Sequence, residues 1–141
     1  HSMPDARVTA APSRLALATI AALGLINLGR GGIHLFAPDG GAVSIAGLDV
    51  TPAPQTILFL FGSLGVGQIA LGLVDMAAAW RWRSFVRPLL AIHLVQLALA
   101  VLALFAIKPP PVFVPGQWFN LALFVLIAVI AGREFLTARR T

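Results

Sequence analysis

The stretch TILFLFGSLGVGQIALGLV, residues 56–74, decides the fold. It contains no Asp, Glu, Lys or Arg, and the uncharged run reaches back to Val50. About 20 apolar residues in a helix cross the roughly 30 Å of hydrocarbon in a bilayer. We therefore expect a transmembrane helix here, and the rest of the chain has to be interpreted around it.

The composition of the whole chain agrees with a membrane environment. The 141 residues are 59% hydrophobic and only 11% charged, with a mean hydropathy of +0.92. A soluble domain carries roughly 25% charged residues, so this chain cannot cover a surface that faces water. The net charge of +5 does not indicate a nucleic-acid partner, because the basic residues flank apolar segments instead of forming one basic face. The chain has no cysteine, which excludes disulfides, thiolate nucleophiles and cysteine-bound metals.

Four segments in total are apolar enough to span a bilayer. We expect helices over residues 14–34, 54–79, 84–107 and 115–132. Pro54 and Pro115 suit the first turn of a helix. Ser13 and Ser84 can cap the first and third helices. The predicted fold is an all-α integral membrane bundle of four transmembrane helices, with a short outer hairpin or loop after the first helix.

The basic residues predict how this bundle sits in a membrane. Arginines precede the first span, fill the connection between the second and third spans, and follow the fourth. Since basic residues are enriched in cytoplasmic loops, we expect both termini in the cytoplasm, and a bacterial inner membrane as the location. Residues 1–12 would be a tag remnant and a cytoplasmic tail, 13–135 a single transmembrane domain, and 136–141 a second cytoplasmic tail. A cleavable signal peptide is the alternative for the N-terminus, but the apolar run is long and no small-x-small cleavage site precedes a polar start.

One amide falls inside each predicted span, at mid-depth or towards the outer side. The four are Asn27, Gln68, Gln96 and Asn120. Polar groups in hydrocarbon face the interior of a bundle or a wet cavity. Two interpretations stay open: the amides hydrogen-bond between helices and hold the bundle together, or they line a polar cavity that opens outward.

One face of the second span combines glycines with polar residues. Gly65, Gln68, Gly72 and Asp75 share this face at helical spacing. Because glycine lets a neighbouring backbone approach closely, we expect tight helix packing along it.

Arg30 carries a permanent charge one turn outward of Asn27, on the same face of the first span. A guanidinium at the centre of a membrane helix costs about 2.5–3.5 kcal/mol on insertion scales, so Arg30 needs a partner. Three possibilities stay open for the Arg30 side chain. It pairs with Asp39 or Asp49 in the outer loop, it binds a ligand with a carbonyl or a negative charge, or it extends to the membrane interface by snorkelling.

Two histidines accompany these groups. His34 lies at the outer surface, and His93 lies a little inward of the centre of the third span, with Gln96 on the same side. An imidazole can carry a proton near neutral pH. The alternatives are an ordinary interfacial histidine for His34 and a hydrogen-bonded core histidine for His93. Two separated histidines without cysteine are a poor metal site, so we expect no metal and no cofactor.

The acidic residues of the spans lie towards the inner side, where arginines gather. We expect Asp75 and Arg87 to form a salt bridge there, with a proton-coupling carboxylate as the alternative role for Asp75. Glu134 follows Arg133 beyond the apolar part of the fourth span, and we expect it to be solvated.

The first span and its exit, residues 22–49, carry a family resemblance. The features are Asn27 and Arg30 inside the span, the sequence GGIHLFAP at residues 31–38, and a glycine-rich second span from Gly62 to Gly72. With the length and the number of spans, they resemble the DoxX-like group of small four-helix bacterial membrane proteins. The resemblance implies a four-helix bundle with cytoplasmic termini and a surface loop after the first helix. Some members of that group are linked to quinone or sulfur-compound respiration, but no residue roles carry over.

Three functional hypotheses follow from these residues. The first is an outward-facing polar seam that binds or passes a small amphipathic ligand such as a lipid, a quinone or an organic anion. Its expected binding residues are Asn27, Arg30, His34, Gln68, His93, Gln96 and Asn120. The alternative is a structural or assembly protein that acts through helix–helix oligomerisation among membrane lipids, as a homo-oligomer. The third is a lipid-phase enzyme with a histidine acid–base; no catalytic residue is assigned, because motifs such as Gly-x-Ser-x-Gly and His-Glu-x-x-His are absent.

Overall fold

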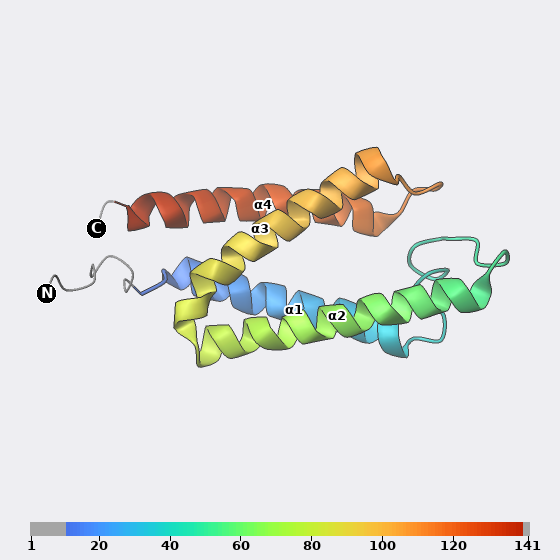
Figure 1. Ribbon diagram of the computed structural model, residues 1–141, viewed down its shortest axis with the longest axis horizontal. Coiled ribbons are helices and arrows are strands. Elements are labelled where there is room, and N and C mark those ends of the chain that lie inside the picture. Colours follow the sequence, from blue (N-terminus) through green and yellow to red (C-terminus); the bar gives the residue numbers. More distant parts are fainter. Residues whose placement is uncertain (1–10, 140–141) are drawn as a thin grey trace, which may run out of the picture.

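The computed structural model describes residues 11–139. Figure 1 shows its four long helices, which are α1 (Arg14–Phe36), α2 (Pro54–Trp80), α3 (Val86–Leu102) and α4 (Pro115–Ala138). A single 3-10 turn, η2 (Arg83–Phe85), leads into α3, and a π-helical turn, η3 (Ala103–Ile107), ends it. The four helical segments are each long and apolar enough to cross a membrane. Residues 11–139 contain no strand, so the predicted all-α bundle of four membrane-spanning helices is confirmed.

The helix starts follow the sequence signals with one exception. The hydroxyl of Ser13 accepts a hydrogen bond from the backbone N–H of Ala16 at 3.1 Å, and prolines open α2 and α4. The expectation for Ser84 is wrong. This residue lies inside η2, and α3 begins at Val86 without a side-chain cap. The 3-10 turn takes the place of the cap because it already engages backbone groups at the start of the helix.

The connection between α1 and α2, residues 37–53, is a loop of turns and not a hairpin. Asp39 organises it: its carboxylate accepts from the backbone N–H groups of Ser44 at 2.7 Å and Gly41 at 2.9 Å. Gly40 and Gly41 have φ values of 59° and 78°, a conformation that favours glycine. The hydrogen bonds that Asp39 accepts, the backbone N–H of Ser44 foremost, lower the pKa of Asp39 from 3.8 to about 2.

Helices α1 and α2 pack closely through two pairs of glycines. A Cβ atom added at Gly65 would lie 2.7 Å from the carbonyl oxygen of Gly31, and one added at Gly72 would lie 2.8 Å from that of Gly24. Both distances are shorter than real Cβ contacts, so only glycine permits this separation of the two backbones. The tight packing expected along the Gly65–Gly72 face is confirmed.

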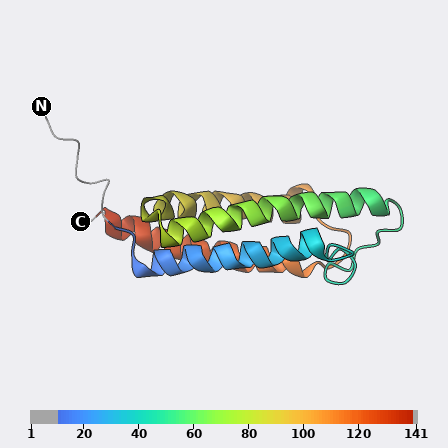
Figure 2. The ribbon, with the colours of Figure 1, turned by 90° about the horizontal axis from the view of Figure 1, so that it is seen from below.

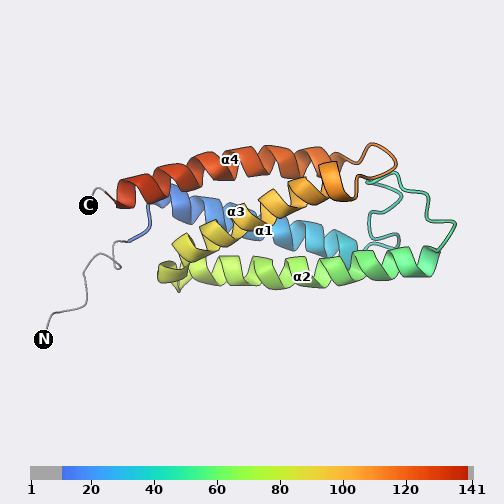
Figure 3. The same cartoon turned by 45° about the horizontal axis from the view of Figure 1, so that its top comes forward.

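The bundle consists of two helix pairs that lie close together at one end only. Figures 1 and 3 show α3 running diagonally from the end of α2 towards the start of α4, so that α2 and α3 diverge along their length. Figure 2, turned by 90°, shows the same elongated bundle with all four helices along its length. The start of α1, the end of α4 and η2 lie at one end of the bundle. The arginines that flank the spans therefore gather at that end.

The apolar core occupies the end of the bundle where α1 begins and α4 ends. Its buried residues are Ala16, Ile20, Leu23, Ala78, Val86, Leu89, Leu90, Leu97, Ile127 and Ala131. Neighbouring lipid is as apolar as these side chains, so close packing rather than the hydrophobic effect holds such helices together. The half of the bundle beyond this core, where α2 and α3 diverge, is where the amides and Arg30 lie.

Candidate ligand-binding cleft

A cleft of about 290 Å³ opens among the four helices in the half of the bundle nearer the α1–α2 loop. Its polar lining comes from all four helices and consists of Asn27, Arg30, Gln68, His93, Gln96 and Asn120. Its apolar lining consists of Leu23, Ile26, Leu64, Leu97, Ala100, Leu104 and Leu123. Apolar walls with a few polar groups are typical of small-molecule sites, and the volume is close to the lower end of the roughly 300–1,000 Å³ range of such sites.

The structure brings six of the seven expected binding residues to this one cleft. The exception is His34, whose Nδ1 lies 2.7 Å from the carbonyl oxygen of Gly40. Its ring also packs edge-on against Phe61, with 5.2 Å between the ring centroids. His34 therefore fastens the outer loop to the ends of α1 and α2 instead of lining the cleft.

Arg30 reaches the cleft and has an amide and an aromatic ring as its neighbours. Its Nη1 donates to Oδ1 of Asn120 at 3.0 Å, and its guanidinium lies 5.6 Å from the centre of the Phe119 ring, within cation–π range. Among residues 11–139 no carboxylate lies within ion-pair distance of Arg30. The side chains of Asp39 and Asp49 hydrogen-bond within their own loop. The hypothesis that pairs Arg30 with one of these aspartates is therefore wrong, because each carboxylate is already engaged by nearby loop groups.

The two glutamines that line the cleft, Gln68 and Gln96, differ in exposure. The Oε1 atom of Gln68 is buried and has no hydrogen-bond partner. An acceptor left in this state costs about 1–3 kcal/mol relative to a satisfied one. Gln96 also lines the cleft, but its side chain is exposed. The cleft is therefore open to its surroundings along α3.

His93 forms a buried cluster with Asp75 and Asn27. Its Nε2 lies 2.8 Å from Oδ1 and 2.9 Å from Oδ2 of Asp75, whose second oxygen also accepts from Nδ2 of Asn27 at 3.3 Å. Asp75 is fully buried and His93 is 2% exposed. Because His93 and Asn27 also line the cleft, the cluster forms part of its wall.

The predicted salt bridge between Asp75 and Arg87 is corrected by this geometry. Asp75 pairs with His93, whereas Nε of Arg87 lies 3.0 Å from Oε1 of Glu134. The depth of the two residues is a signal that favours the first pair, although depth alone does not decide it. Asp75 lies about one and a half turns before the end of α2, and His93 lies about two turns after the start of α3. Residues at these positions in consecutive antiparallel helices lie at similar depth.

Glu134 is buried, so its expected solvation is also wrong. It is 3% exposed and accepts hydrogen bonds from the backbone N–H and the hydroxyl of Ser13, besides its ion pair with Arg87. The reason is the length of α4, which continues to Ala138 beyond the predicted end at residue 132. Ile127, Ala131 and Glu134 then share one buried face.

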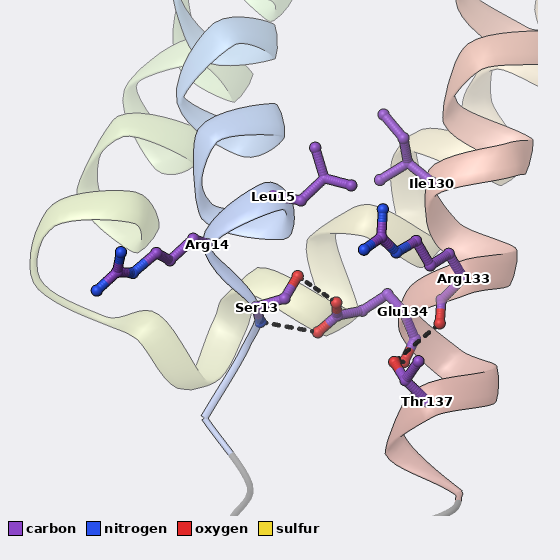
Figure 4. A pocket seen from close by; sticks show the side chains of 7 residues that line it. All are labelled: Ser13, Arg14, Leu15, Ile130, Arg133, Glu134 and Thr137. Carbon is purple, nitrogen blue, oxygen red and sulfur yellow. Dashed lines mark hydrogen bonds between the residues drawn. The ribbon is translucent and has the colours of Figure 1, made fainter.

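A second cavity, of about 350 Å³, lies at the opposite end of the bundle (Figure 4). It is lined by Ser13, Arg14, Leu15, Ile130, Arg133, Glu134 and Thr137. Figure 4 shows Ser13 and Glu134 hydrogen-bonded to each other, while Arg14 extends on the other side of α1, away from α4. The carboxylate of this cavity is thus already satisfied within the protein, so this cavity is a weaker candidate for a binding site than the cleft.

A π-helical turn that sequence analysis did not expect closes the far end of α3. The backbone N–H of Lys108 donates to the carbonyl oxygen of Ala103 at 2.7 Å. The carbonyl oxygen of Leu104, a residue that lines the cleft, instead accepts from Nε2 of Gln117 at 2.8 Å. π-Helical turns occur frequently at functional sites. The proline run that follows α3 signals the helix end but not this geometry.

These features define a class: a small bundle of helices able to span a membrane, with a polar cleft beside a buried Asp–His pair. Comparisons of the chain with protein-family models, with curated proteins and with solved structures found no match. The resemblance to DoxX-like proteins therefore stays a prediction. Within residues 11–139 no group of three His, Asp or Glu side chains is arranged to hold a metal ion.

Proposed function

We propose that the protein binds a small amphipathic organic anion in the cleft, with the acidic group of the ligand at Arg30. The observation that carries this proposal is the guanidinium of Arg30, which reaches the cleft with an amide and an aromatic ring as its neighbours. Among residues 11–139 no carboxylate lies within ion-pair distance of it. A charge in this position is costly unless it is paired. An anionic ligand supplies the missing counter-charge.

The neighbouring groups fit the rest of such a ligand. Guanidinium presents a planar fork of donors that matches a carboxylate, sulfonate or phosphate. Gln68 contributes a buried Oε1 that lacks a donor, which suits a hydroxyl or N–H on the ligand. The leucines of the lining suit an aliphatic or aromatic body. A lipid with an acidic headgroup and a free organic anion share this chemistry, whereas a quinone offers only neutral carbonyl oxygens to Arg30.

The test uses the purified protein in nanodiscs of phosphatidylcholine, which carry no net charge. The probe is a fluorescent alkylsulfonate, and an uncharged alcohol of the same length and a short-chain quinone serve for comparison. We expect saturable binding of the sulfonate that weakens at least about tenfold in Arg30→Gln, because a lost charge-assisted interaction is worth about 1.5–3 kcal/mol. Arg133→Gln, at the opposite end of the bundle, is the matched control and keeps full affinity. Equal binding by parent and Arg30→Gln contradicts the proposal, and stronger binding of the quinone than of the sulfonate reassigns the ligand class.

The same proposal includes an orientation in the membrane. The end that holds the start of α1, η2 and the end of α4 carries most of the arginines of the chain, and basic residues are enriched on the cytoplasmic side. We infer that this end faces the cytoplasm of a bacterial cell and that the cleft opens in the outer half of the membrane. The variants Ile45→Cys and Ser84→Cys, treated with an impermeant maleimide on intact cells, test this. Labelling is expected at residue 45 and not at residue 84. Labelling at residue 84 but not at residue 45 would show the opposite orientation.

A further inference from the structure

We propose that the Asp75–His93 pair is a proton-binding site in the wall of the cleft, and that its protonation is linked to the binding of an anion at Arg30. This inference rests on the proposed function and adds regulation to the same site. The pair is buried, and His93 is the one titratable side chain besides Arg30 in the lining of the cleft.

The burial of the pair limits the charge that it can carry. With one shared proton the pair is neutral overall, as an aspartate with an imidazolium or as a carboxylic acid with a neutral imidazole. Without that proton the pair carries one negative charge inside the bundle. Burial penalises this last state because an uncompensated charge is expensive in a low-dielectric interior. The nearest polar neighbour of the carboxylate besides His93, the amide of Asn27, donates a hydrogen bond but brings no charge.

Among residues 11–139 no second charged side chain lies within ion-pair distance of the pair. Arg81 and Arg83, in the connection between α2 and α3, are exposed. Asp75 is the only titratable residue of α2. In α1, Arg30 lies about one turn after Asn27 and hydrogen-bonds to Asn120. His34 and Arg14 lie near the two ends of the helix. In α3, Arg87 is paired with Glu134 of α4. Arg133, the remaining charged side chain of α4 in its last turns, is exposed at the end of the bundle.

The two sites of the cleft are therefore coupled through charge. Removing the proton places a negative charge in the wall against which the anion must bind, while Arg30 keeps its charge across the physiological range. The pair takes the proton from water as the pH falls and returns it as the pH rises. Affinity for the anion is consequently high when the pair holds its proton and falls when the proton leaves. By thermodynamic reciprocity, anion binding raises the fraction of pairs that hold the proton.

The test measures affinity for the fluorescent alkylsulfonate between pH 5 and pH 8.5 in the same nanodiscs. The sulfonate stays ionised throughout, so its own titration does not contribute. We expect the affinity of the parent protein to fall about tenfold as the pH rises, within the roughly 5–150-fold range typical of coupling between two sites. The double variant Asp75→Asn/His93→Gln lacks both titratable groups, so the affinity that it retains is expected to be independent of pH over this range. Asp39→Asn, in the loop outside the cleft, is the matched control and keeps the pH dependence of the parent.

A second measurement needs no variant in the cleft. Binding of the sulfonate to the parent protein in weakly buffered solution, followed with a pH indicator near neutral pH, is expected to take up protons from solution. A pH-independent affinity without proton uptake overturns the inference while the proposed function stands. A pH dependence that persists in the double variant assigns the proton to another group and also overturns it. Absence of saturable binding at any pH defeats the proposed function itself.

Discussion

Arg30 donates a hydrogen bond from Nη1 to Oδ1 of Asn120 at 3.0 Å, which joins α1 to α4 beside the cleft. An amide oxygen satisfies one donor of the guanidinium, but no carboxylate of residues 11–139 supplies a counter-charge within ion-pair distance. The protein thus holds a cation in the bundle that has a hydrogen-bond partner but lacks the ion-pair partner that a buried charge requires. An anionic ligand at Arg30 would supply the missing negative charge.

Asn120→Asp places a carboxylate where the amide oxygen lies. We expect the new ion pair to raise the thermal unfolding temperature and to abolish binding of the alkylsulfonate, because Arg30 then has an internal counter-charge. Thermal unfolding in detergent and binding in nanodiscs measure the two effects. The control is Asn120→Leu, which removes the amide without adding charge and should leave binding of the sulfonate detectable. If Asn120→Asp binds the sulfonate as tightly as the parent, Arg30 does not hold the anion.

Gln68→Leu removes the buried acceptor that has no partner. Replacing an unsatisfied polar group by an apolar group of similar shape stabilises the protein, here by about 1–3 kcal/mol, while ligands that donate to Oε1 lose affinity. Thermal unfolding in detergent measures the first effect. Gln117→Leu serves as the control: its Nε2 donates to the carbonyl oxygen of Leu104, so its loss should lower stability. A fall in stability for Gln68→Leu equal to that for Gln117→Leu would show that Gln68 contributes a structural hydrogen bond.

Gly65→Ala tests the close packing of α1 on α2. The added Cβ atom would lie 2.7 Å from the carbonyl oxygen of Gly31 and 2.8 Å from the backbone nitrogen of Leu35, neither of which can move alone. We expect a loss of about 1–3 kcal/mol, typical of overpacking, in reversible unfolding with denaturing detergent. Gly67→Ala is two residues away and meets nothing within 4 Å, so it should unfold like the parent. Equal stability of the two variants would mean that the helices do not pack at these glycines.

The order of the α1–α2 loop should depend on the ionisation of Asp39. Its pKa is lowered from 3.8 to about 2 by backbone hydrogen bonds, Ser44 foremost. A carboxyl group whose pKa is lower in the folded loop stabilises the loop above its unfolded pKa, and this contribution is lost as the pH falls through the folded value. We expect amide exchange at Gly41 and Ser44, corrected for the intrinsic rate, to stay slow down to about pH 4 and to quicken towards pH 2. In Asp39→Asn this acid-induced change should be absent; an identical change in both proteins would assign it to another group.

The apolar residues carry most of the information about the fold. Uncharged stretches such as residues 56–74 predict the spans because only helices of this length and composition suit a bilayer. Pro54 and Pro115 mark the helix starts since a proline in the first turn sacrifices no hydrogen bond. The end of α4 could not be placed as well, because Arg133 and Glu134 look like the limit of an apolar segment although Glu134 is buried.

The cleft could be predicted in part. Amides at similar depth in four helices indicate a common polar region whatever the helix order, and the structure brings Asn27, Gln68 and their counterparts together. Partner choice could not be predicted, because it depends on the rotation of each helix about its axis. The predicted partner of Asp75 is therefore Arg87, whereas in the structure Asp75 pairs with His93. The π-helical turn η3 likewise left no sign in the sequence, since its residues are as apolar as those of the helix before it.

We propose that an amphipathic anion occupies the cleft with its acidic group at Arg30. The most direct measurement is a crystal structure of the protein grown with a brominated alkylsulfonate, in which anomalous scattering locates the bromine atom. We predict a sulfonate within hydrogen-bonding distance of the guanidinium of Arg30 and a bromine peak among the leucines of the cleft. Anomalous peaks confined to the lipid-facing surface or to the arginine-rich end, with none in the cleft, would contradict the account.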